Sequence, residues 1–253
     1  MPDTPFPLQG PIEVIAHRGF SARAPENTLA ALALGVSAGA DAVEFDLHAT
    51  RDGVPVLLHD TTLDRTTDHS GAVAELTHAE LAGIDAGSWF SPDYASEPMP
   101  TVGAAYDLLG PTGVRIYPEV KRTGRPEDLH RVAELADEAG LLGRTVFISM
   151  DWDALDTIRS AAPRALIGYI VERPARAEDA IARAAGDERA LVDFDARILL
   201  ALPGYAAQAH ERDVPLATWT VNSVDEAARL LALGIPRITT NEVAELVAWR
   251  DTL

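Results

Sequence analysis

Several absences limit what this chain can be. Its 253 residues include no cysteine, which excludes a disulfide framework, a thiolate nucleophile and a cysteine-ligated metal. No apolar run approaches the roughly 20 residues that a membrane-spanning helix needs. The start of the chain, Met1 to Pro11, has no basic region followed by an apolar run, so we expect no signal peptide. These features predict a cytoplasmic protein without stable membrane association.

Positive charge is also scarce. The chain has 21 Lys and Arg against 39 Asp and Glu, a formal net charge of -18. This excess repels polyanions and argues against nucleic acid as a partner. An anionic substrate would need positive charge concentrated at its binding site by a few side chains or a metal ion. Lys121 is the only lysine in the sequence, which favours a position that requires a compact ammonium group.

Short apolar runs alternate with alanine-rich helical patterns along the chain, which is typical of βα units around a parallel sheet. The predicted strands are Ile12 to His17, Ala42 to Leu47, Val54 to His59, Val114 to Val120, Thr145 to Ser149, Ala165 to Ile170, Leu191 to Phe194, Leu216 to Val221 and Arg237 to Thr240. The predicted helices include Thr28 to Ala38, Leu129 to Ala139, Trp152 to Ala161, Ala175 to Ala185 and Asp225 to Leu233. Glycines follow three of these helical patterns, as glycines that end helices do: Gly140, Gly186 and Gly234.

The strand pattern predicts a barrel with one extra strand. About six residues separate the second and third runs, whereas a parallel crossover needs about a dozen or more, so this pair should be an antiparallel hairpin. The remaining strands predict an α/β fold of one domain, 1–253, in the form of a (β/α)8 TIM barrel. A long stretch follows His59 before the next barrel strand. We expect approximately residues 60–100 to form a small inserted subdomain after the second barrel strand.

The hairpin link contains Asp52-Gly53, a strong signal for a two-residue turn. With the turn centred there, His59 lies opposite Asp46, and cross-strand partners project from the same face. A three-residue turn would break this parity.

Polar residues gather at strand ends, where a barrel carries its catalytic groups. Glu44 and Asp46 are two residues apart, so both point to one side of their strand. Glu119 lies on the next barrel strand, and three converging carboxylates favour a hard divalent cation such as Ca²⁺ or Mg²⁺. His17 and His59 are either zinc ligands or an acid/base pair.

Two basic residues accompany these groups. Arg18 follows the first strand and Lys121 ends the strand that carries the third carboxylate, so both can supply the positive charge that a phosphate needs. Taken singly, a glutamate at a barrel rim is more often a salt-bridge partner than a metal ligand. The prediction therefore rests on the occurrence of these groups together at several strand ends.

In order and spacing, the motifs resemble those of the glycerophosphodiester phosphodiesterase family, within the superfamily of TIM barrels that resemble phosphatidylinositol phosphodiesterases. The motifs are His17-Arg18-Gly19, Pro25-Glu26-Asn27-Thr28, Glu44-Phe45-Asp46, His59-Asp60, Gly87-Ser88-Trp89-Phe90, Pro118-Glu119-Val120-Lys121 and Trp219-Thr220-Val221-Asn222. The resemblance runs from about Ile12 to Glu245. One departure is Val102-Gly103-Ala104-Ala105, where the family often has an acidic helix start.

The resemblance implies hydrolysis of glycerophosphodiesters to glycerol 3-phosphate and an alcohol, a step of glycerol and lipid metabolism, with one divalent cation, Ca²⁺ or Mg²⁺. By motif it implies metal ligands at Glu44, Asp46 and Glu119, an acid/base pair at His17 and His59, phosphate contacts at Arg18 and Lys121, and an apolar wall for the glycerol at Trp219. Adjacency suggests that Asp60 orients His59 and that Glu26 pairs with Arg18. The nucleophile is either the neighbouring glycerol hydroxyl, which would give a cyclic phosphate, or water.

Other functions fit the pattern less well. A lipid-acting relative on the same fold, such as a lysophospholipase D or a sphingomyelinase D-like enzyme, would want an apolar rim. A non-catalytic barrel scaffold would be expected to lose a histidine or a carboxylate, and none is missing. An unrelated metal-dependent isomerase or aldolase would leave the His-Arg-Gly strand end unexplained. The expected partner is a small glycerophosphodiester; its alcohol stays open, as does the choice between monomer and homodimer.

Overall fold

The computed structural model describes residues 5–8, 10–121 and 125–253. Eight parallel strands close into a barrel because β1 pairs with both β2 and β9. A ninth strand, β3, continues the sheet beyond β2 as an antiparallel edge. The strands are β1 (Glu13–Ala16), β2 (Ala42–Ala49), β3 (Pro55–Leu57), β4 (Arg115–Val120), β5 (Val146–Ser149), β6 (Leu166–Val171), β7 (Ala190–Asp195), β8 (Leu216–Trp219) and β9 (Arg237–Thr240). The TIM-barrel prediction is confirmed.

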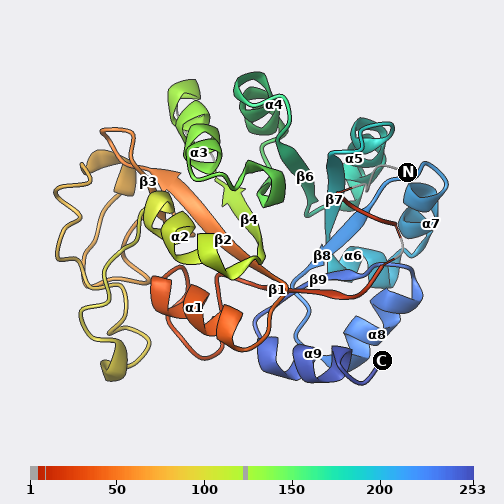
Figure 1. Cartoon of the computed structure of the whole chain (residues 1–253), viewed down its shortest axis with the longest axis horizontal. Coiled ribbons are helices and arrows are strands. Elements are labelled where there is room, and N and C mark those ends of the chain that lie inside the picture. The colour runs from red at the N-terminus through yellow and green to blue at the C-terminus, as the bar shows by residue number, and fades with distance from the viewer. Residues whose placement is uncertain (1–4, 9, 122–124) are drawn as a thin grey trace.

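Helices surround the barrel (Figure 1). They are α1 (Leu29–Ser37), α2 (Val102–Leu109), α3 (Pro126–Glu138), α4 (Trp152–Ala161), α5 (Ala177–Ala184), α6 (Ala196–Ala201), α7 (Gly204–His210), α8 (Val224–Ala232) and α9 (Val243–Arg250). Each predicted helix is present, while α2, α6, α7 and α9 were not among those predicted. The departure at Val102-Gly103-Ala104-Ala105 lies in the first turn of α2, where the Thr101 hydroxyl accepts a hydrogen bond from the Ala104 N–H.

The glycine signals are confirmed as well. Gly140, Gly186 and Gly234 all have positive φ values, between 69° and 80°, the conformation in which glycine ends a helix at little cost.

Two apolar layers hold the barrel together. The inner layer consists of alternate strand residues such as Ile15, Tyr117, Ile148 and Leu191. The outer layer packs the other strand faces against the helices. Because alternate residues of a strand point to opposite faces, a polar residue in phase with the inner layer projects into the barrel. That rule positions the side chains of the site.

The hairpin register differs from the expected one. Leu47 pairs with Leu57 and Ala49 with Pro55, so Asp46 lies opposite Leu58, whose N–H donates to the Asp46 carbonyl over 3.1 Å. The turn therefore holds three residues, 51–53, and the predicted pairing of His59 with Asp46 is wrong. Because β3 ends at Leu57, the alternation of side chains along the strand does not set the direction of the His59 side chain. His59 lies in the loop that follows β3.

Residues 58–101 connect β3 to α2 with little regular structure. They contain two short 3₁₀ turns, η1 (Val73–Glu75) and η2 (Pro92–Tyr94), and form the looped region to one side of the barrel in Figure 1. A small apolar cluster of their own includes Leu63, Leu81 and Ile84. On this basis we propose that residues 60–100 are an inserted subdomain within the single domain 1–253. Among the described residues no helix has the length and apolar character to cross a membrane.

Candidate active site

A pocket lies at the carboxyl ends of the barrel strands and brings the predicted groups together. Its lining residues are His17, Arg18, Glu44, His59, Glu119, Lys121, Ile148, Met150, Ile170, Asp193, Trp219 and Thr239. Every predicted site residue except Asp46 is among them. Asp46 is fully buried, and its carboxylate contacts two of the lining residues, Arg18 and Lys121.

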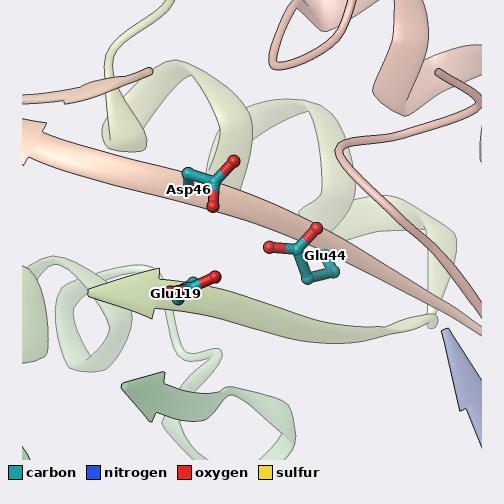
Figure 2. A group of neighbouring side chains, drawn as sticks. All are labelled: Glu44, Asp46 and Glu119. Atoms are coloured by element: carbon teal, nitrogen blue, oxygen red, sulfur yellow. The ribbon is translucent and has the colours of Figure 1, made fainter. Parts of the chain in front are cut away.

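Three carboxylates converge at this pocket. Glu44 and Asp46 project from the same side of β2, and Glu119 faces them from β4 (Figure 2), where it pairs in register with Asp46. One oxygen from each of the three lies within 4.8 Å of the others. Strand parity predicted that Glu44 and Asp46 share one side of β2, and the register between β2 and β4 explains why Glu119 meets them.

The loop after β1 is shaped around Glu44. Arg18 has a φ of 56°, an uncommon conformation for a non-glycine residue, and its N–H donates to Oε2 of Glu44 over 2.7 Å. Gly19 follows with a φ of 77°. A Cβ there would overlap the backbone of Ala31 and Leu32 in α1, so the close approach of loop and helix requires glycine.

Asp46 is held by more partners than the other two carboxylates. Its Oδ2 accepts from Nδ2 of Asn27 at 2.8 Å, and its own N–H donates to Oδ1 of Asn27 at 3.0 Å. Nε of Arg18 lies 3.1 Å from Oδ2, and Nζ of Lys121 lies 2.9 Å from Oδ1. Burial alone would raise the pKa of Asp46, but Lys121 and Arg18 outweigh it and hold the pKa well below its usual range. Asp46 is therefore ionised.

Lys121 bridges two carboxylates. Its Nζ also lies 2.7 Å from Oε1 of Glu119. Burial and then the charge of Asp46 raise the pKa of Glu119 to about 7, and burial together with Asp46 and Glu119 raises the pKa of Glu44 well above its usual range. Lys121 and Arg18 together thus do not neutralise the three carboxylates, and further positive charge would be bound favourably.

His17 is fixed from one side. Its Nδ1 lies 2.7 Å from Oδ1 of Asn241, which also accepts from the Ser21 hydroxyl at 2.9 Å. An amide oxygen can only accept, so the hydrogen of the neutral ring resides on Nδ1. Nε2 lies 4.0 Å from Oε2 of Glu44. Burial, then the neighbouring Arg18, lowers the pKa of His17 to about 4.

His59 lies at one end of a chain of ion pairs. Its Nδ1 lies 2.6 Å from Oδ1 of Asp60, and Arg65 binds Asp60 at 2.7 Å and Glu26 at 2.8 Å. Glu26 in turn accepts from Arg18 at 2.8 Å. Both expected contacts, Asp60 with His59 and Glu26 with Arg18, are present. Arg65, which joins them, was not predicted, because it lies in the irregular segment where no periodicity marks its direction.

The carboxylate cluster fits a hard divalent cation. Oε2 of Glu44 is occupied by the Arg18 N–H, while Oε1 is buried and, among the described residues, has no hydrogen-bond partner. Burying an unpaired carboxylate oxygen is costly, and Ca²⁺ and Mg²⁺ take carboxylate oxygens as ligands. The donor set consists of oxygens alone, which suits these cations better than zinc.

Three further residues complete the site. Asn27 and Asn241 orient a carboxylate and a histidine, and Asp193 on β7 is a buried lining residue. Burial and the charge of Glu119 raise the pKa of Asp193 well above its usual range. Its sequence signal was a lone acidic residue in the apolar strand 191–194, two positions after the inward-facing Leu191, a spacing that puts it in the barrel interior.

Comparison with known proteins gives a consistent result. A model of the Glycerophosphoryl diester phosphodiesterase family matches residues 17–245. The chain is 30% identical over 260 residues to a probable glycerophosphodiester phosphodiesterase 1 of Mycobacterium tuberculosis, covering 96% of this chain and 94% of the relative. It is 28% identical over 244 residues to a glycerophosphodiester phosphodiesterase of Caldanaerobacter subterraneus, covering 92% and 96%. A phosphodiesterase of Oleispira antarctica, solved with its product sn-glycerol-3-phosphate, superposes with a TM-score of 0.80 at 27% identity, covering 97% of each chain.

Proposed function

Because the chain belongs to the glycerophosphoryl diester phosphodiesterase family, and is thus an enzyme that hydrolyses glycerophosphodiesters, we propose that it releases glycerol 3-phosphate and an alcohol by His/His acid–base catalysis with one divalent cation. The observation that carries this proposal is the convergence of three carboxylates, two histidines and two basic side chains on one pocket. The net charge of -18 supports a small diester as substrate rather than nucleic acid. We place the enzyme in the cytoplasm, as a monomer or homodimer.

We assign Glu44, Asp46 and Glu119 as the residues that hold the cation, Ca²⁺ or Mg²⁺. The support is the unpartnered Oε1 of Glu44 and the approach of the three carboxylates to within 4.8 Å. When bound, such a cation supplies positive charge to phosphoryl oxygens and stabilises the charge that builds in the transition state.

Arg18 and Lys121 bind the phosphate in this scheme. Both line the pocket, and both are already held by Asp46, which fixes their charged groups before substrate arrives. Preorganised donors of this kind stabilise the phosphoryl oxygens without rearranging during the reaction. Trp219 provides the wall against which the glycerol carbons pack.

His17 and His59 transfer the protons. With its hydrogen held on Nδ1 by Asn241, neutral His17 offers the Nε2 lone pair, the form that takes a proton from the nucleophile. The Asp60 carboxylate beside His59 stabilises an imidazolium, the form that protonates the leaving alkoxide. The nucleophile is water or the adjacent glycerol hydroxyl, and transient cyclic glycerophosphate would identify the hydroxyl.

The direct test is to treat the purified protein with EDTA and to supply glycerophosphocholine or glycerophosphoethanolamine with Ca²⁺, Mg²⁺, Mn²⁺ or no metal. We expect glycerol 3-phosphate only in the presence of a cation. Release of choline phosphate in place of choline would contradict the assignment of the cleaved bond, and full activity in EDTA would contradict the metal requirement.

A further inference from the structure

Two buried polar atoms on one side of the pocket have no hydrogen-bond partner among the described residues. They are Oδ1 of Asp193 on β7 and Nε1 of Trp219 on β8. Both side chains line the pocket, and their strands are hydrogen-bonded neighbours. A carboxyl oxygen can accept a hydrogen bond and an indole N–H donates one, so a ligand hydroxyl, which can donate and accept at once, could satisfy both atoms.

Such atoms are uncommon in folded proteins, because a buried polar group without a partner lowers stability. The other residues that line this side of the pocket are mainly apolar: Ile148, Met150 and Ile170. An acceptor and a donor left unsatisfied within an apolar wall point to a ligand group that satisfies both.

The position of the pair sets it apart from the groups assigned to the phosphate. In the order of strands around the barrel, β7 lies across from β2, which carries Glu44, and β8 lies across from β4, which carries Lys121. Asp193 also lies outside the carboxylate group that could hold a cation, which consists of Glu44, Asp46 and Glu119 in the described part of the chain. A substrate whose phosphate is bound on the side of β2 and β4 would therefore extend its glycerol carbons toward β7 and β8.

We propose that Asp193 and Trp219 bind the terminal hydroxyl of the glycerol moiety, with the Asp193 carboxyl accepting its hydrogen and the Trp219 indole N–H donating to its oxygen. This inference rests on the proposed function. The terminal hydroxyl is the one farthest from the phosphate, so it is the one that reaches the opposite wall, whereas the secondary hydroxyl stays near the reacting phosphorus.

The pair makes the pocket selective for deacylated diesters. An acyl group on the terminal oxygen removes the hydrogen that Asp193 accepts, and leaves its carboxyl buried without a partner. Sites built to hydrogen-bond a hydroxyl reject analogues that lack it far more strongly than apolar pockets reject a size change. Lysophospholipids, which carry such an acyl group, are then poor substrates.

The test compares two diesters that differ in one group. sn-Glycero-3-phosphocholine carries the terminal hydroxyl, and 2-hydroxypropyl phosphocholine lacks only that hydroxyl and keeps the secondary one. The ratio of their kcat/KM values is measured for the wild type and for Asp193→Leu, Asp193→Asn and Trp219→Phe. Asp137→Asn, an exposed position on α3, is the matched control. Thermal melting establishes that each variant folds.

We expect the wild type and the control to prefer the glycerol diester by at least about tenfold. Asp193→Leu should bring the ratio close to one while its Tm stays equal or rises, since an unpartnered buried carboxyl is removed. Asp193→Asn and Trp219→Phe, which each keep part of the pair or the wall, should give intermediate ratios.

Three results would overturn the inference. Equal loss of activity on both diesters in the Asp193 variants would indicate a structural or metal-related role. Equal hydrolysis of both diesters by the wild type would remove the selectivity and leave the proposed function standing. No hydrolysis of either diester by the wild type, with any cation, would reject the proposed function and this inference with it.

Discussion

The backbone N–H of Arg18 donates to Oε2 of Glu44 over 2.7 Å. This bond joins the loop after β1 to the carboxylate of β2, and it leaves the other oxygen of Glu44 without a partner among the described residues. The same peptide turn directs the Arg18 side chain toward Asp46, 3.1 Å away. One strained loop thus positions a proposed metal ligand and a proposed phosphate contact, so its geometry should control both stability and activity.

Gly19→Ala tests that loop. The new Cβ would overlap the backbone of Ala31 and Leu32 at a φ of 77°, so we expect a loss of about 2 kcal/mol in the free energy of unfolding, or about 4–8 °C in Tm. Activity at a temperature where the variant is folded should fall with it, because Arg18 is displaced. Gly143→Ala is the control, since a Cβ there meets nothing within 4 Å. A Gly19 variant as stable as the Gly143 variant would show that the close approach is not required.

Glu44→Gln should separate stability from function. Without a cation, three buried carboxylates repel one another, so neutralising one should raise the free energy of unfolding of the EDTA-treated protein by about 1 kcal/mol, or about 2–4 °C in Tm. The gain in Tm that Mg²⁺ or Ca²⁺ gives the wild type should disappear. Differential scanning calorimetry with and without the cation measures both effects. Glu245→Gln, exposed on α9, controls for the loss of one charge, and a full metal-dependent gain in Glu44→Gln would remove that residue from the ligand set.

Lys121→Arg tests the need for a compact ammonium. Nζ lies 2.9 Å from Asp46 and 2.7 Å from Glu119, and a planar guanidinium cannot occupy that point without moving a carboxylate. We expect kcat/KM to fall at least about tenfold, in a protein that still folds. The reverse exchange at the exposed Arg212, Arg212→Lys, should have no effect. Near-normal turnover in Lys121→Arg would mean that positive charge alone suffices there.

Asp60→Asn tests the orientation of His59. The amide keeps the size of the carboxyl but no longer stabilises an imidazolium, so kcat should fall about tenfold or more with a smaller change in KM. Hydrogen bonds from Arg65 lower the pKa of Asp60 to about 2, so this carboxylate is charged at every pH above about 3. Asp60 itself therefore does not titrate between pH 5 and pH 8. A variant whose kcat equals that of the wild type throughout that range would contradict Asp60 as the partner of His59.

Much of the architecture could be predicted because strand parity and spacing are local properties. The i, i+2 spacing of Glu44 and Asp46 placed both carboxylates on one side of β2, as the structure has them (Figure 2). The short link after β2 correctly set the hairpin apart from the barrel strands. The turn itself was predicted one residue too short, since Arg51 joins Asp52 and Gly53 in it and nothing in the dipeptide Asp-Gly excludes a longer turn.

Other parts of the site depend on contacts that the sequence does not show. Asn241 reaches His17 from the far end of the chain, 224 residues away, because β9 closes the barrel against β1. Arg65 lies in an irregular segment, where no period indicates which way a side chain points. Asp193 could have been found by parity within its strand, and its role depends on what faces it across the barrel.

In the function we propose, Glu44, Asp46 and Glu119 hold one cation on which hydrolysis depends. The most direct measurement is a titration of the EDTA-treated, dialysed protein with Mg²⁺, Ca²⁺ or Mn²⁺, in which calorimetric binding and glycerol 3-phosphate release are followed on the same samples. We predict one binding site, activity that rises in proportion to its occupancy, and loss of both in Glu44→Gln. Hydrolysis at the full rate with the site empty, or unchanged binding in Glu44→Gln, would contradict the account.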